Sequence, residues 1–124
     1  MPMTPGKFKQ EVLKHYNDIN KKIFNTGVKR QDLEWVGNKL LFISINARLP
    51  LLKILDEHDP EVITRVHKVL HDRVKEELKE MLESIFDLRV AAILKDYDVM
   101  TEYSGTIVIL ERDVQEYLKD TPEL

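Results

Sequence analysis

Hydrophobic side chains recur at steps of three and four between Asp59 and Leu88. This spacing is that of one face of an α-helix, and it is formed by Val62, Ile63, Val66, Leu70, Val74, Leu78, Met81 and Ile85. Asp59 can cap the first turn, where Pro60 has no N–H to leave unpaired. The pattern predicts a helix over 60–86. Its length of about 40 Å would overhang a seven-residue strand of about 23 Å.

A second amphipathic stretch begins at Thr4-Pro5, which offers the same capping chemistry. Its apolar face is formed by Phe8, Val12, Tyr16, Ile19 and Ile23. Gly27 is expected to close this helix in the left-handed conformation. Gly37-Asn38 then suits a two-residue hairpin turn with positive φ, and apolar residues alternate on both sides of it: Leu33, Trp35, Leu41, Ile43 and Ile45. Residues up to 45 therefore predict a helix followed by a hairpin.

The second half of the chain predicts a similar succession after a compact apolar piece that follows Pro50. That piece is expected to form a short helix, and the long helix comes next. A strand over 88–97 places Val90, Ala92 and Leu94 on one side, and a strand over 105–111 has apolar residues on both sides, so both faces of this last hairpin could be covered. A short closing helix is expected from Asp113.

The two halves align with each other at an offset of 62 residues. Seven positions register, of which four are identical: Phe8, Val12, Tyr16, Ile19, Ile23, Phe24 and Val28 with Leu70, Val74, Leu78, Met81, Ile85, Phe86 and Val90. We therefore expect a single domain over 1–124 with an internal repeat of about 8–46 and 70–110. The predicted fold class is α+β, with element order α-β-β-α-α-β-β-α: two helix-strand-strand units form a four-stranded antiparallel sheet with the helices on one face.

Several turns and strand ends resemble the YbcI-like family of small bacterial proteins of unknown function. The resemblance rests on Asn25-Thr26-Gly27-Val28-Lys29-Arg30, Val36-Gly37-Asn38-Lys39, Leu94-Lys95-Asp96-Tyr97-Asp98 and Gly105-Thr106-Ile107-Val108. It covers nearly the whole chain and implies a one-domain bacterial cytoplasmic protein. By association, it also suggests an accessory role in inorganic-carbon uptake. It transfers no catalytic residue, because turns serve the fold whatever the function.

Composition narrows the range of functions. The 124 residues are 43% hydrophobic and 33% charged, which fits one soluble domain. There is no cysteine, so disulfides and thiolate metal sites are excluded. No apolar run suits a signal peptide or a membrane span, so a cytoplasmic protein without membrane insertion is expected. A net charge of −3 disfavours nucleic acid, although basic residues outnumber acidic ones up to Arg30.

Two clusters could hold a metal ion. His67 and His71 stand four residues apart on the long helix, as in zincins, but Lys68 occupies the position of the zincin glutamate. No third ligand is fixed by the sequence, although Asp72 and His58 are nearby candidates. Two helical histidines are more often boundary residues, so no metal is expected there.

The second cluster lies in the loop of the last hairpin. Asp96, Asp98 and Glu102 could offer oxygen ligands to a hard cation, whereas Asp side chains more often close turns by bonding their own backbone. Tyr97 and Tyr103 in the same loop are expected to cover the edge of the core. We therefore expect neither a metal nor a cofactor at this loop.

Other chemistry lacks the residues that it needs. Isolated glycines exclude a G-x-G-x-x-G loop or a P-loop, and no serine lies in a nucleophile elbow. The leading hypothesis is a non-enzymatic, oligomeric interaction or regulatory module whose protein partner the sequence does not identify. The alternative is a small-ligand or metal-dependent enzyme that uses the His67/His71 helix or the Asp96/Asp98 loop.

The predicted oligomer is a homodimer built on the extra length of the long helix. In the repeat register the segment 60–66 has no counterpart in the first half. Together with the preceding apolar piece it forms a candidate interface: Leu51, Leu52, Ile54, Leu55, Val62, Ile63 and Val66. Apolar patches of this size are rare on monomers, and a two-fold dimer is the simplest way to cover one. The competing reading is that the short helix folds back and covers the patch within the subunit.

Overall fold

The computed structural model of the chain describes residues 3–119. Its elements follow the order α1 (Pro5–Phe24), β1 (Arg30–Val36), β2 (Lys39–Ile45), α2 (Pro50–His58), α3 (Pro60–Phe86), β3 (Val90–Tyr97), β4 (Tyr103–Leu110) and α4 (Val114–Lys119). This order confirms the predicted α+β class. Local chemistry marks the helix starts as expected, because Thr4 Oγ1 accepts from the Lys7 N–H at 3.2 Å and Asp59 Oδ1 accepts from the Val62 N–H at 3.1 Å.

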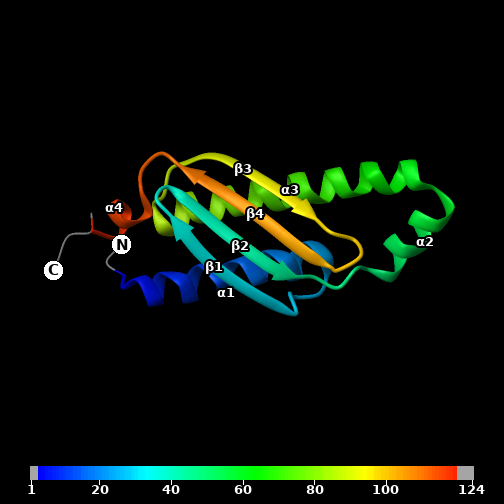
Figure 1. Cartoon of the computed structure of the whole chain (residues 1–124), viewed down its shortest axis with the longest axis horizontal. Helices are drawn as coiled ribbons and strands as arrows, with labels where there is room; N and C mark the ends of the chain where they lie inside the picture. Colours follow the sequence, from blue (N-terminus) through cyan, green and yellow to red (C-terminus); the bar gives the residue numbers. More distant parts are fainter. Residues whose placement is uncertain (1–2, 120–124) are drawn as a thin grey trace.

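The four strands form one antiparallel sheet in the order β1-β2-β4-β3. The strands lie in front of α1 and α3 in Figure 1, so both long helices cover the same face of the sheet. We call this covered face the inner face and the opposite one the outer face. The outer face is not covered by any element within residues 3–119, although apolar residues on both sides of β4 allowed both faces to be covered.

The core lies between the inner face and the two helices. Strand residues that are buried there include Leu33, Leu40, Phe42 and Val108, and the facing helix residues include Phe8, Val12, Leu78 and Leu82. The short helix α4 closes one end of this layer through Val114 and Tyr117, which are both buried. Burying aliphatic and aromatic side chains between two layers is the main source of stability in a domain of this size.

The long helix α3 extends past the sheet, as its length predicts, and α2 packs beside this overhang (Figure 1). Both α1 and α3 end at a phenylalanine, Phe24 and Phe86, which are 62 residues apart. The next residues, Asn25 and Asp87, both adopt left-handed conformations with φ of 60° and 59°. These caps agree with the register of the proposed repeat, and the superposition of 8–46 on 70–110 stays a prediction.

The end of α1 differs from the prediction. Asn25, not Gly27, takes the left-handed conformation. A glycine is required at position 27 for a different reason, because a Cβ there would lie 2.7 Å from Asn17 Oδ1. That oxygen accepts a hydrogen bond from the Val28 N–H at 2.9 Å and so closes the connection to β1. Gly37 does adopt the expected positive φ, of 60°, in the hairpin turn.

A bulge in β3 corrects a second prediction. Val90 pairs with Leu110 and Ala92 pairs with Ile109, so β3 contains one extra residue at this point. An extra residue reverses the faces of all later side chains. Val90 is therefore buried on the inner face, whereas Ala92 and Leu94 lie on the outer face and Lys95 turns inward. The expectation that Val90, Ala92 and Leu94 share one side is wrong.

Candidate functional site

The outer face carries an exposed apolar surface on the central strands β2 and β4. Ile43 is 49% exposed, Tyr103 is 49% exposed and Leu94, on the adjoining β3, is 54% exposed. The sheet is hollowed here by about 680 Å³, and the apolar lining consists of Leu41, Ile43, Ile45, Leu94, Tyr103 and Ile107. A contiguous apolar surface of this kind on a small domain marks an interaction site.

Carboxylates border this hollow on both edge strands. Asp32 and Glu34 lie on β1, and Asp96 lies on β3 in the same row of the sheet as Asp32. Lys9 of α1 reaches Asp32 at 3.1 Å and lowers the pKa of that carboxyl by hydrogen bonding. Arg30, the first residue of β1, also lines the hollow. The apolar surface is therefore bordered by mainly negative charge.

His67 and His71 lie side by side on α3, with ring centroids 5.9 Å apart. The ring of Tyr97 contacts His67 edge-on at 6.2 Å. Burial lowers the pKa of His67, with a further lowering by Arg48. Burial also lowers the pKa of His71, to about 4, and the charge of Lys95 adds to this effect. Both effects favour the neutral imidazole.

The carboxylates of Asp96 and Asp98 accept hydrogen bonds from the backbone of their own loop. Asp98 Oδ1 accepts from the N–H groups of Met100 and Thr101 at 2.9 and 3.1 Å, and Asp96 Oδ1 accepts from the Tyr97 N–H at 2.8 Å. These are the contacts of ordinary turn chemistry. Within residues 3–119 no group of three or more His, Asp or Glu side chains could hold a metal ion.

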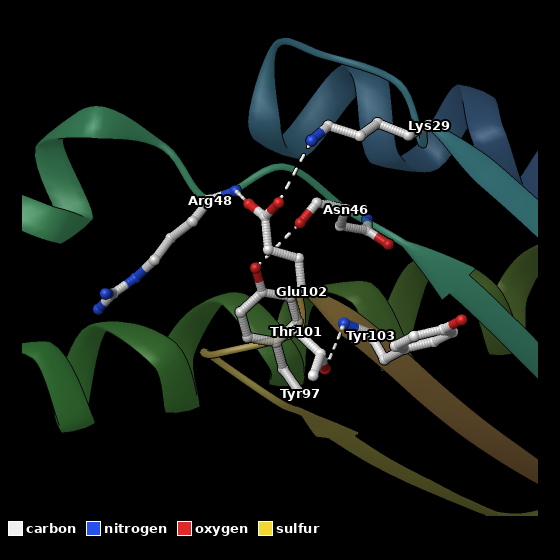
Figure 2. A network of polar contacts seen from close by, with 7 residues as sticks. All are labelled: Lys29, Asn46, Arg48, Tyr97, Thr101, Glu102 and Tyr103. Carbon is white, nitrogen blue, oxygen red and sulfur yellow. Dashed lines mark hydrogen bonds and ion pairs between the residues drawn. The ribbon is translucent and has the colours of Figure 1, made fainter.

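Glu102 ties the last hairpin to the chain that follows β2. One carboxylate oxygen accepts from the Arg48 N–H at 2.7 Å and the other from Lys29 Nζ at 3.2 Å, as Figure 2 shows. The same two partners lower the pKa of the Glu102 carboxyl. Tyr97 donates from its hydroxyl to the Asn46 carbonyl at 2.9 Å (Figure 2). These bonds hold the backbone of 46–48 in place and so orient the Arg48 side chain.

The predicted interface residues differ in how far they are buried within the subunit. Leu52 and Ile63 are buried within the subunit, Leu55, Val62 and Val66 are partly buried, and Leu51 and Ile54 are 65% and 54% exposed. The helices α2 and α3 therefore cover part of this patch within one subunit, while Leu51 and Ile54 remain on the surface.

Sequence reasoning missed two features of the molecule. The sequence contained a signal for the apolar outer face, because β4 carries apolar residues on both of its sides, with Ile107 on one side and Val108 on the other. The inward position of Lys95 had none, since it depends on the bulge in β3. Both features are produced by residues that come together only through strand pairing.

Three comparisons with known proteins bear on these surfaces. A family model described as the Na⁺-translocating membrane potential-generating system (MpsC) matches residues 4–112. No curated protein and no solved structure matches the chain. Across residues 3–119, none of the helices is both long and apolar enough to traverse a bilayer.

Proposed function

Because the chain belongs to the MpsC family, described as a Na⁺-translocating membrane potential-generating system, we propose that it is a non-enzymatic accessory protein of such a system. It acts in the cytoplasm and docks through its outer face onto a membrane subunit. The resemblance to the YbcI-like family, which the comparisons do not confirm, would narrow this role to inorganic-carbon uptake.

The exposed apolar surface of the outer face carries the proposal. Leu41, Ile43, Leu94 and Ile107 lie together on three adjacent strands, the central strands β2 and β4 and the edge strand β3. Covering four such side chains would supply a favourable free energy of several kcal/mol before the entropy cost of association. An exposed apolar surface of this kind is typical of an interaction site on a small domain.

The charges at the border specify the chemistry of the partner. Asp32, Glu34 and Asp96 favour a segment that has apolar residues along its middle and Lys or Arg along its sides. Cytoplasmic segments next to membrane spans are rich in Lys and Arg. The proposed occupant is therefore a basic, amphipathic cytoplasmic segment of the ion-translocating membrane subunit.

Site-specific photo-crosslinking in the native cells tests this proposal. A photo-reactive amino acid replaces Leu94 on the outer face or, as the matched control, Val69, which is 67% exposed on α3. Position 94 is expected to yield an adduct with a Lys- and Arg-rich segment of an integral membrane protein, and position 69 is expected not to. A synthetic peptide of that segment should bind the wild-type chain, and salt should weaken the binding.

Three outcomes would overturn the docking proposal. They are the same adduct from both positions, an adduct of position 94 with a second copy of this chain, and a peptide that binds the Ile107→Asp variant as well as the wild type. The Ile107→Asp variant should in addition lower the Na⁺-dependent membrane potential of the cells, with Val69→Asp as its control.

The homodimer predicted from the sequence is a separate proposal that concerns α2. Leu51 and Ile54 would form the centre of its contact, because they remain exposed on one subunit. Sedimentation at micromolar concentration is expected to give a dimer that Ile54→Asp converts to a monomer and that Ile107→Asp leaves intact. A wild-type monomer would show that folding of α2 onto α3 closes the patch sufficiently.

A further inference from the structure

A lysine lies in the layer between the sheet and the helices. The Nζ of Lys95 donates to Ser104 Oγ at 2.8 Å, to Thr106 Oγ1 at 3.2 Å and to Tyr16 Oη at 3.3 Å. All three partners are hydroxyl groups. Within residues 3–119 none of the ion pairs includes Lys95. Its positive charge is therefore solvated by neutral oxygens and lacks a counter-ion.

Lys95 is partly buried, and a partly buried cation without a counter-ion is stabilised when an anion approaches it. Burial raises the pKa of the nearby Tyr16 phenol, but the charge of Lys95 and hydrogen bonds with neighbouring side chains outweigh burial and lower it. Its ring also faces the ammonium, with Nζ 5.9 Å from the ring centroid. The arrangement stabilises the charge of Lys95 but leaves room for a stronger partner.

A cavity of about 50 Å³ adjoins Lys95 between α2, α3 and the sheet. Its polar lining combines Arg48, His67, His71, Lys95, Tyr97 and Ser104. Among the described residues that line the cavity none is acidic, and its other walls include Phe24, Leu49, Leu52 and Leu70. The cavity therefore joins several N–H and O–H donors to an apolar enclosure, which is the usual composition of a small-ligand site.

Arg48 supplies a second, independent observation at this cavity. Its side chain is 9% exposed, and its Nε is buried without a hydrogen-bond partner. The terminal nitrogens contact Asp56 at 3.3 Å and 3.4 Å. Asp56 thus compensates the charge of Arg48 but leaves one N–H unsatisfied, and a buried unsatisfied donor normally indicates a missing partner.

We propose that this cavity binds a small, planar, monovalent oxyanion of the carboxylate or nitrate class. Lys95, His67 and His71 line the cavity and would surround the anion. Tyr97 and Ser104 also line the cavity. The site is distinct from the outer face and does not depend on the proposed docking.

Volume and charge set the size of the anion. A water needs about 10–15 Å³ measured in this way, so the cavity of about 50 Å³ admits about three to five such positions. Formate, acetate and nitrate have three or four non-hydrogen atoms, whereas sulfate and phosphate have five and carry more charge. One uncompensated cation, that of Lys95, calls for one negative charge.

Histidine-resolved NMR of the full chain provides the test, because four histidines are distributed inside and outside the site. The chain is titrated with sodium formate while sodium chloride keeps the ionic strength constant. His67 and His71 are expected to shift saturably and His15 and His58 to stay unchanged. The pKa of His71 should also rise in bound protein, since a nearby anion favours the protonated imidazole.

Variants separate the site from a general salt effect. Lys95→Met should weaken formate binding about ten- to a hundredfold, since the attraction between the Lys95 charge and the anion is lost. Lys79→Met, which removes an exposed lysine of α3 outside the cavity, should leave formate binding unchanged. Sulfate should not compete with formate.

The wild-type titration decides the proposal even where Lys95→Met does not fold. Unsaturable shifts, equal shifts of all four histidines, or a folded Lys95→Met variant that binds formate as the wild type does would each overturn it.

Discussion

The two ends of the inner face of the sheet differ sharply in chemistry. At the end near α4 the four strands present a row of apolar side chains, Trp35, Leu40, Val108 and Ile93. At the other end the corresponding row is Gln31, Ser44, Ser104 and Tyr97. The row between them changes character half-way, from Leu33 and Phe42 to Thr106 and Lys95.

The helices match this division. Phe8 packs edge-on against Trp35 and Phe86 at the apolar end, with centroid distances of 5.6 Å in both pairs. At the polar end Asn20, which is fully buried, donates to the Tyr16 carbonyl at 2.9 Å and accepts from Asn46 Nδ2 at 2.9 Å. The first end is a core, whereas the second is a hydrogen-bonded network that opens into the cavity beside Lys95.

Within this one layer, the apolar end contributes to stability and the polar end is a candidate for function. In the register of the proposed repeat, Lys95 occupies the position of Leu33, which is fully buried. Replacing a core leucine by a lysine sacrifices buried apolar area and requires polar partners. Natural sequences depart from the packing rule mainly where a function depends on the departure, so the polar end is the better candidate for a ligand site.

The largest effect is expected at the apolar end. Leu40→Ala should lower the free energy of unfolding by about 2–5 kcal/mol, since it leaves a cavity in a fully buried position. Leu41→Ala, the next residue of β2, points to the outer face and should cost less than about 1.5 kcal/mol. Denaturant unfolding of both variants measures the difference, and equal losses would contradict the assignment of the two faces.

The second prediction breaks the polar network. Asn20→Ala should cost about 1–3 kcal/mol, because it leaves the Asn46 amide without its partner in a buried place. Asn17→Ala in the same helix removes one half-exposed hydrogen bond and serves as its comparison. If Asn20→Ala unfolds at the same denaturant concentration as the wild type, the network contributes nothing to stability.

The third prediction uses the pH dependence of His71, whose pKa falls from its usual 6.5 to about 4. Burial comes first among the causes, followed by Lys95 and His67, while Asp96 opposes them and Lys75 adds to them. The unfolded state takes up the proton below pH 6.5 and the folded state only near pH 4. The free energy of unfolding therefore falls as the pH drops through this window.

Because His71 is only half-buried, solvent screening limits this effect to about 1–2 kcal/mol. Subtracting the unfolding curve of His71→Gln from that of the wild type isolates it from the carboxyl groups that also titrate near pH 4. Parallel curves for the two proteins between pH 6.5 and pH 4 would show that His71 titrates normally.

The smallest effect is expected at the connection that leads into the polar end. Gly27→Ala places a Cβ 2.7 Å from Asn17 Oδ1 and should break the bond from the Val28 N–H. The loss is about 0.5–1.5 kcal/mol, that of one hydrogen bond. Gly6→Ala, where a Cβ would meet nothing within 4 Å, is the control, and hydrogen exchange of the Val28 amide locates the change.

The features that the sequence alone determined depend on interactions between residues close together in the chain. Helix starts at Thr4 and Asp59, the amphipathic stripes and the turn at Gly37 depend on residues within a few positions of one another, so their pattern predicts them directly. The α+β class followed from the same patterns. The family followed from a match over residues 4–112, which the local patterns alone did not provide.

Tertiary structure decided which faces and which distant groups meet. One extra residue in β3 turned Lys95 inward, and the pairing of β2 with β4 brought Ser44 beside Ser104. The sheet order also left the outer face open, although alternation in β4 is compatible with cover on both sides. Strand pairing and a bulge act between residues that are far apart in the chain, and a periodicity of two records the alternation of side chains but not which face is covered.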